Sequence, residues 1–280
     1  MNEASLEDLV ALAVDGDATA LDSVVRAIKD DIYGLAIRML WLPADAEDAT
    51  QEILIRVITG LGSFEGRAGF RSWVYRVAVR GLLNFRRGRV EGGSVTFEEF
   101  GEDLLVGLSP APAQMHDAER AVLRREVKIA CTQAMLLCLD RDHRMAYLLG
   151  EIFALDGKEA AECLEVSAAT YRKRLSRARQ RVTRFTESSC GLVSRDAKCS
   201  CEGRITPALE AGRIDPQTLL FANHPVAEVN KAEIDAVVST IGRVCDGAAL
   251  MRSNPTYQAP ESLLQRVTSL AGGNRENSDT

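Results

Sequence analysis

The fold of this chain is constrained most by a change of composition at residues 90–115, which separates two stretches of helical character. The segment collects residues typical of turns and charged linkers: Gly92, Gly93, Pro110, Pro112 and five acids without a base between Glu91 and Asp103. Domains commonly hold about 100–150 residues, so a chain of 280 residues is long enough for two small domains and an extension. We therefore predict two domains rather than one.

Both flanking stretches read as helices, and the predicted fold class is all-α. Hydrophobic residues make up 46% of the chain and aromatic residues only 5%, which indicates a helix-rich globular protein. The predicted order is a helical domain at 5–89, a flexible linker at 90–115, a helical domain at 116–187 and a mostly helical extension at 188–280. Within the first domain, a break between helices is predicted from Gly60-Leu61-Gly62 through Gly69.

Positive charge is concentrated in two places although the net charge is −6. Seven arginines and no acid lie from Arg67 to Arg89, and seven basic residues and no acid lie from Arg172 to Arg184. Such stretches are typical of nucleic-acid binding, although a charged helix face is often simply solvated. The pattern indicates DNA binding at two places.

Residues 45–61 predict an amphipathic helix. The helical period separates two sets of side chains: Asp45, Asp48, Glu52 and Arg56 on one face, and Ile53, Leu54, Val57, Ile58 and Leu61 on the other. The apolar face predicts a buried side. The acidic face is either a solvated surface or a docking surface for a partner.

Residues 70–89 interleave arginines with aromatic residues. Positive charge along the backbone and aromatic or arginine surfaces for unstacked bases are what single-stranded nucleic acid requires. Phe70, Trp73 and Val77 also share a helical spacing. For Trp73, packing in the core is therefore favoured over contact with a base.

Residues 156–182 predict a helix-turn-helix. A short helix around Lys158–Glu165 is followed by a turn in which Ser167 can cap a second, basic helix. One apolar stripe runs along this second helix: Tyr171, Leu175, Ala178, Val182 and Phe185. Such a helix fits the major groove of DNA. A basic amphipathic helix could also bind a membrane or a partner protein, but the preceding helix and turn favour DNA.

The motifs DAEDATQE, FRSWVYRVAVR and TYRKRLSRAR, in this order, resemble the extracytoplasmic-function (ECF) group of the sigma-70 family over residues 5–187. The resemblance implies a promoter-specificity subunit that is not an enzyme and requires no cofactor for DNA binding. The first domain would be sigma region 2, which binds the clamp of core RNA polymerase and melts the −10 element. The second would be the region 4 helix-turn-helix, which binds the −35 element as duplex DNA. Whether a separate anti-sigma protein also binds is left open.

The resemblance also places functional residues. Polymerase-binding positions are Asp45, Asp48, Gln51 and Glu52. The −10 positions are Ser63, Phe64, Glu65, Gly66 and Arg67 in a base-capturing loop, with Arg76, Arg80, Asn84, Arg86 and Arg87 on the adjoining helix. The −35 positions are Ser167, Thr170, Tyr171, Arg172, Lys173 and Arg174, with Arg177 and Arg179 for phosphates. Two departures are Arg80, where the family often has Asn, and Asp140, where proline commonly opens the second domain's LPxxxR pattern.

The extension has no strong counterpart in the common family core, and we expect it to be regulatory. Three of its four cysteines, Cys190, Cys199 and Cys201, could bind a structural or sensory zinc ion with His224 as the fourth ligand, and Cys245 lies further along the chain. The C-x8-C-x-C spacing is not one of the strong zinc patterns, so thiol oxidation and a structural role stay open. The remaining cysteines of helical segments are expected in the core: Cys131, Cys138 and Cys163.

We expect a cytoplasmic protein that does not enter the membrane, because the acidic N-terminus lacks signal-peptide features and no apolar run is long enough to span a bilayer. Other functions fit the sequence less well. A stand-alone helix-turn-helix regulator gives no reason for the acidic helix at 45–61. A thiol-dependent enzyme would be built around Cys199-Ser200-Cys201, but nothing near them in the sequence argues for an activated thiol. A thiol- or metal-sensing protein is a further alternative.

Overall fold

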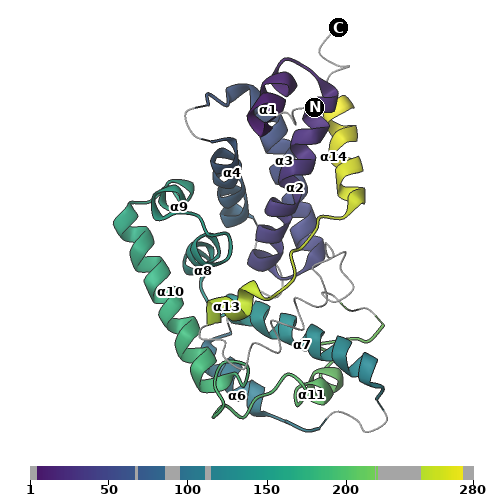
Figure 1. Ribbon diagram of the computed structural model, residues 1–280, viewed down its shortest axis with the longest axis vertical. Helices are drawn as coiled ribbons and strands as arrows, with labels where there is room; N and C mark the ends of the chain where they lie inside the picture. Colours follow the sequence, from purple (N-terminus) through teal and green to yellow (C-terminus); the bar gives the residue numbers. More distant parts are fainter. Residues whose placement is uncertain are drawn as a thin grey trace. The chain divides into compact units, whose positions relative to one another are not determined.

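The computed structural model describes residues 5–66, 69–85, 95–110, 115–217, 219 and 247–273 (Figure 1). Helices dominate these residues, which confirms the all-α class; an isolated bridge joins Cys190 and Cys199. Within the described ranges, no helix is long and apolar enough to cross a membrane. The chain forms two compact units. Unit 1 comprises 1–90, 156–171 and 257–280, and unit 2 comprises 91–155 and 172–256.

Unit 1 is a helical bundle built around one central helix, α2. Its elements are α1 (Leu6–Val14), α2 (Ala18–Leu40), α3 (Pro43–Gly60), the 3₁₀ turn η1 (Leu61–Ser63), α4 (Phe70–Asn84), α9 (Gly157–Cys163) and α14 (Glu261–Gly273). Helices α1, α3, α4 and α14 all pack against α2. Tyr33, Leu35 and Ile37 of α2 are fully buried. The bundle therefore has its hydrophobic core along α2.

Local sequence explains where the helices of the bundle begin and end. The Asp17 carboxylate accepts hydrogen bonds from the amides of Thr19 and Ala20, at 2.8 and 3.0 Å, and so caps α2. Pro43 stands in the first turn of α3, where its missing N–H costs nothing. Helix α3 ends at Gly60, which confirms the predicted break.

Helices α3 and α4 approach closely at Gly81. A Cβ atom at this position would lie 2.8 Å from Cγ1 of Ile53 and 3.1 Å from a guanidinium nitrogen of Arg56. A larger residue would push the two helices apart. The glycine therefore fixes the spacing of the two helices that carry the predicted region 2 residues.

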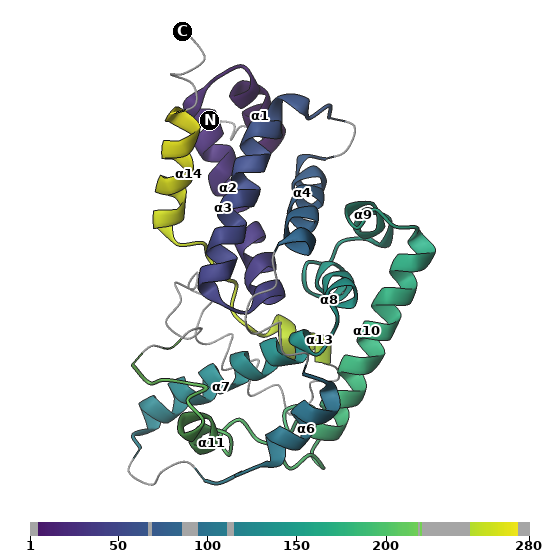
Figure 2. The ribbon, with the colours of Figure 1, turned by 180° about the vertical axis from the view of Figure 1, so that it is seen from behind.

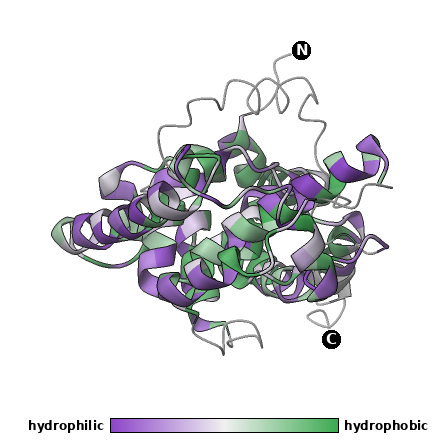
Figure 3. Ribbon diagram, turned by 90° about the horizontal axis from the view of Figure 1, so that it is seen from below, coloured by the Kyte–Doolittle hydropathy of each residue, from purple (hydrophilic) through white to green (hydrophobic). Residues whose placement is uncertain are grey.

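Unit 2 holds α6 (Phe97–Leu105), α7 (Asp117–Leu137), α8 (Arg141–Tyr147), the π-helical turn η2 (Leu148–Ile152), most of α10 (Ala168–Ser189), α11 (Ile205–Glu210) and α13 (Gly247–Arg252). Figure 2 shows the same ribbon from behind. In Figure 3, hydrophobic and hydrophilic residues alternate along the helices, as amphipathic helices require. One core cluster joins Leu123 and Val127 of α7 to Ile205 and Ala208 of α11.

The segment predicted as a flexible linker contains a helix, α6. The Thr96 hydroxyl accepts from the amide of Glu99, and the Glu99 carboxylate accepts from the amide of Thr96, which is a capping box. The rings of Phe97 and Phe100 lie 5.2 and 5.4 Å from the ring of Phe185 on α10. Acidic composition concealed this helix because few of its residues are apolar. Phe97, Phe100 and Leu104 lie on the side that packs, whereas Leu105 is exposed.

Candidate polymerase and DNA interface

Helix α3 presents an acidic face opposite a buried one. Asp48 and Glu52 are exposed, whereas Asp45 and Gln51 are partly buried. The opposite side is buried at the predicted positions Ile53, Leu54, Val57 and Leu61, and Ile58 is partly buried. The amphipathic prediction for this helix is therefore confirmed.

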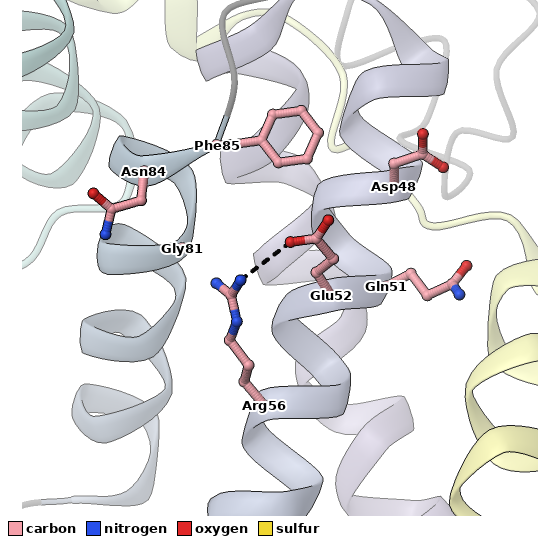
Figure 4. A pocket seen from close by; sticks show the side chains of 7 residues that line it. All are labelled: Asp48, Gln51, Glu52, Arg56, Gly81, Asn84 and Phe85. Atoms are coloured by element: carbon pink, nitrogen blue, oxygen red, sulfur yellow. Dashed lines mark hydrogen bonds and ion pairs between the residues drawn. The ribbon is translucent and has the colours of Figure 1, made fainter.

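An open cleft of about 410 Å³ lies between α3 and α4 (Figure 4). Its lining residues are Asp48, Gln51, Glu52, Arg56, Gly81, Asn84 and Phe85. Arg56 pairs with Glu52 one turn earlier, with 3.1 Å between nitrogen and oxygen, and both side chains are about half exposed. The structure thus brings the predicted −10 residue Asn84 to the same cleft as three predicted polymerase-binding residues, which the sequence alone did not indicate.

The loop between α3 and α4 is anchored by an aromatic cluster. The ring of Phe64 lies 5.4 Å from that of Phe70 and 5.6 Å from that of Trp73, and the last two are 5.7 Å apart. Phe70 is fully buried, whereas Phe64 and Trp73 are partly buried. These contacts agree with the packing role predicted for Trp73, and they hold Phe64 at the base of the loop.

The other predicted −10 residues lie at or near the surface. Ser63, Glu65, Gly66, Arg80 and Asn84 are exposed, and Arg76 is partly buried. Ser63 donates a hydrogen bond to the carbonyl of Gly60 at 2.6 Å, and Gly66 has a φ of 67°. Arg80 forms an ion pair with Glu165. Arg67, Arg86 and Arg87 lie outside the described residues.

The helix-turn-helix forms as predicted, from α9 and α10. The Asp156 carboxylate caps α9 by accepting from the amides of Lys158 and Glu159, at 2.8 and 2.9 Å. The Ser167 hydroxyl accepts from the amide of Thr170 at 3.1 Å and so caps α10. Between the helices, Glu165 has a φ of 54°. A non-glycine residue in this left-handed region marks a tight turn.

The apolar stripe of α10 is buried at every predicted position: Tyr171, Leu175, Ala178, Val182 and Phe185. This result corrects one −35 assignment. Tyr171 is only 2% exposed, so its ring packs inside the protein instead of being offered to DNA. The resemblance placed it among the −35 positions, although the helical period had already placed it on the apolar stripe.

The basic residues of α10 differ in how they are engaged. Arg172, Lys173 and Arg177 are exposed. Arg174 pairs with Asp142 at 2.7 Å, and Arg179 forms an ion pair with Glu151. Exposed basic residues and ion-paired arginines therefore alternate along this helix.

Comparison with known proteins decides the family. The profile of Sigma-70 region 2 matches residues 24–91, and that of Sigma-70 region 4 matches residues 129–182. The RNA polymerase sigma-H factor of Pseudomonas aeruginosa is 31% identical over 63% of this chain and 91% of its own length. The chain belongs to the ECF group of the sigma-70 family.

A second relative of this sigma factor agrees. The ECF RNA polymerase sigma factor SigW of Bacillus subtilis is 30% identical over 59% of this chain and 88% of the relative. The solved structure of CnrH in complex with the cytosolic domain of CnrY aligns with a TM-score of 0.43 and 22% identity, covering 64% of this chain and 94% of that chain. Family membership makes core RNA polymerase and promoter DNA the partners of the sigma factor.

The structure gives a reason for the aspartate that replaces proline in the sigma factor's region 4. The Asp140 carboxylate accepts from the amide of His143 at 3.0 Å and caps α8. The buried Arg144, four residues later, donates to the carbonyls of Leu136 and Leu139, at 2.8 and 2.9 Å. Asp140 therefore starts α8 while Arg144 closes the end of α7.

Three cysteines of the extension lie beside one from α7. Cys131, Cys190, Cys199 and Cys201 line one cavity of about 20 Å³. Burial raises the pKa of Cys199 to about 11 and that of Cys201 to about 12. It also raises the pKa values of Cys131 and Cys190. The thiols are therefore protonated at neutral pH, which opposes reactivity.

The zinc prediction gains no support. Among the residues that the structure describes, no group of three or more His, Cys, Asp or Glu side chains is placed to hold a metal ion. His224 lies outside the described residues. Cys131 joins the three predicted cysteines although it is far from them in sequence, so no local spacing could have revealed it. The four thiols pack against Leu104 and Val127 around the cavity.

Proposed function

We propose how the residues of this sigma factor divide the work of promoter-specific initiation. Asp45, Asp48, Gln51 and Glu52 dock on the clamp of core polymerase. Ser63 to Arg67 and the polar residues of α4 bind the melted −10 strand. The exposed basic residues of α10, with Ser167 and Thr170, bind the −35 duplex. The domains would follow the predicted division at 5–89, 116–187 and 188–280, and the protein would act in the cytoplasm without a cofactor.

One observation carries this proposal: two charged faces of opposite sign stand on two helices whose other faces are buried. Asp48 and Glu52 are exposed on α3, and Arg172, Lys173 and Arg177 are exposed on α10. Charges on the rim of an interface steer association and fix orientation. A basic helix behind a tight turn meets phosphates and base edges. Both faces would act by binding alone, so the chain would catalyse no reaction by itself.

We also propose that the extension regulates initiation, because it lies outside the two matched family regions and yet packs on helices of both units. A protein that exchanges between an open and a closed state can be regulated by anything that shifts this equilibrium. The zinc site is not part of this proposal.

Transcription by purified core polymerase tests the function. Adding the chain under reducing conditions should produce transcripts with defined start sites from genomic DNA. The chain without polymerase should bind the same promoters at most weakly. Tight duplex binding without polymerase, and no new transcripts with it, would favour the stand-alone regulator.

A further inference from the structure

The last described helix of the chain is seated on the helix that carries the proposed polymerase-binding residues. Helix α14 packs against α3 and, less extensively, against α2, all within unit 1. Both ribbon views show it lying alongside these two helices (Figures 1 and 2). The contact joins residues about 220 positions apart, since Arg266 pairs with Glu47 across a separation of 219.

Apolar contacts hold α14 and the segment before it within unit 1. Leu263, Leu264 and Val267 of α14 are buried, as are Tyr257 and Ala259 in the segment that leads into it. The Arg38 guanidinium lies 4.6 Å from the centre of the Tyr257 ring, a cation–π contact. Helix α14 therefore packs against α3 and α2 with one apolar side and exposes Ser262, Gln265 and Arg266 on the other, as an amphipathic helix bound to a helical surface does.

Polar contacts fix the register of this helix. The amide of Ala259 donates to the Asp30 carboxylate at 2.9 Å. Glu261 pairs with Arg26 of α2 at 2.8 Å, and Arg266 pairs with Glu47 of α3 at 3.3 Å. The Glu47 partner lies between the proposed polymerase-binding residues Asp45 and Asp48 along the chain. The extension therefore contacts α3 within the proposed docking segment.

Gln51 lies between helix α14 and the exposed acidic residues of α3. It is partly buried, whereas Asp48 and Glu52 beside it are exposed. Figure 4 shows the Gln51 side chain extending toward α14, while Glu52 and Arg56 face α4. One edge of the acidic face of α3 is therefore turned to the extension, and the other edge borders the open cleft.

We propose that α14 is an intramolecular antagonist that competes with core polymerase for α3. The proposal rests on the proposed polymerase-binding role of α3 and names what regulates it. Two ligands that use the same edge of one helix cannot both be seated there. Ordering a terminal helix costs conformational entropy that offsets much of its apolar burial, so such a helix can be displaced by a partner that binds more extensively.

The test compares two variants of the full-length protein, each of which introduces two aspartates. Leu263→Asp/Val267→Asp places carboxylates in the buried seat and should release α14. Ser262→Asp/Gln265→Asp places them on the exposed side of the same helix and should leave it seated. If the released state makes up about a tenth of the wild type or less, releasing α14 should tighten binding to core polymerase about tenfold or more. The control variant should bind like the wild type.

Hydrogen exchange provides a measurement that does not depend on a variant. Adding core polymerase to the wild type should slow amide exchange in α3 and speed it in residues 257–267. Slowed exchange in both segments, or weaker binding by a Leu263→Asp/Val267→Asp protein of unchanged helicity, would show that α14 is part of the docking platform and overturn the proposal. Binding by none of the three proteins would instead contradict the polymerase-binding role of α3 itself.

Discussion

The acidic face of α3 and the basic face of α10 look alike as patterns but differ in what competes for them. Both stand opposite an apolar stripe that is buried in the structure. Beside α3 lies a whole helix, α14, from the far end of the chain. On α10 the competitors are single acids, Asp142 and Glu151, which pair with Arg174 and Arg179. The charge pattern of a helix in the sequence therefore does not show whether a packed helix or a few ion pairs must be displaced before a partner binds.

The largest expected effect concerns the buried side of α10. Tyr171→Ala should lower the free energy of unfolding by about 3–5 kcal/mol, because it removes a buried ring. Tyr171→Phe keeps the ring and should cost about 1 kcal/mol or less. Urea unfolding measures both. If Tyr171→Phe kept the stability but lowered affinity for −35 duplex DNA tenfold, the Tyr171 hydroxyl would bind DNA and our correction would be wrong.

On α3, Asp48→Lys/Glu52→Lys should weaken binding to core polymerase by about 2–3 kcal/mol, roughly a hundredfold, since it reverses the sign of the docking face. Both side chains are exposed, so helicity should be kept, and loss of the half-exposed Glu52–Arg56 pair should lower the free energy of unfolding by about 1 kcal/mol or less. Glu7→Lys/Asp15→Lys on and beside α1 makes the same change in net charge at exposed positions and serves as the control. Equal weakening by both variants would mean that only the net charge matters, and that α3 is not a specific docking surface.

On α10, the exposed Arg172 and the paired Arg179 should behave differently. Arg172→Ala should cost about 1–3 kcal/mol at one −35 position and relax the base preference there. Arg179→Ala should weaken binding across sequences and lower the salt slope by about one unit. Part of that loss should be offset, because Arg179 must first leave Glu151. Binding titrations at several salt concentrations with matched and mismatched duplexes separate the two. Identical profiles would remove the distinction between exposed and paired arginines.

Helical periodicity accounts for the parts of this structure that depend on neighbouring residues. It predicted the buried side of α3, the stripe on α10 and the Ser167 cap, because each arises within one or two turns. It could not place α14 on α3 or bring Cys131 to the other cysteines, since these contacts depend on the tertiary path of the chain. The helix α6 was missed for a different reason: a capping box and two phenylalanines outweighed an acidic composition.

The smallest expected effect lies in the turn that orients α10. Glu165 has a φ of 54°, a region that costs a residue with a Cβ about 1–2 kcal/mol and costs glycine little. Glu165→Ala and Glu165→Gly both remove the ion pair with Arg80, so their difference isolates the backbone. We expect the glycine variant to be more stable than the alanine variant by about 1 kcal/mol in urea unfolding, with equal affinity for −35 DNA. An alanine variant as stable as the glycine variant would show that the turn is not held in this left-handed conformation in solution. The turn would then not fix the direction in which α10 leaves α9, and the exposed basic residues at the start of α10 would have no fixed orientation.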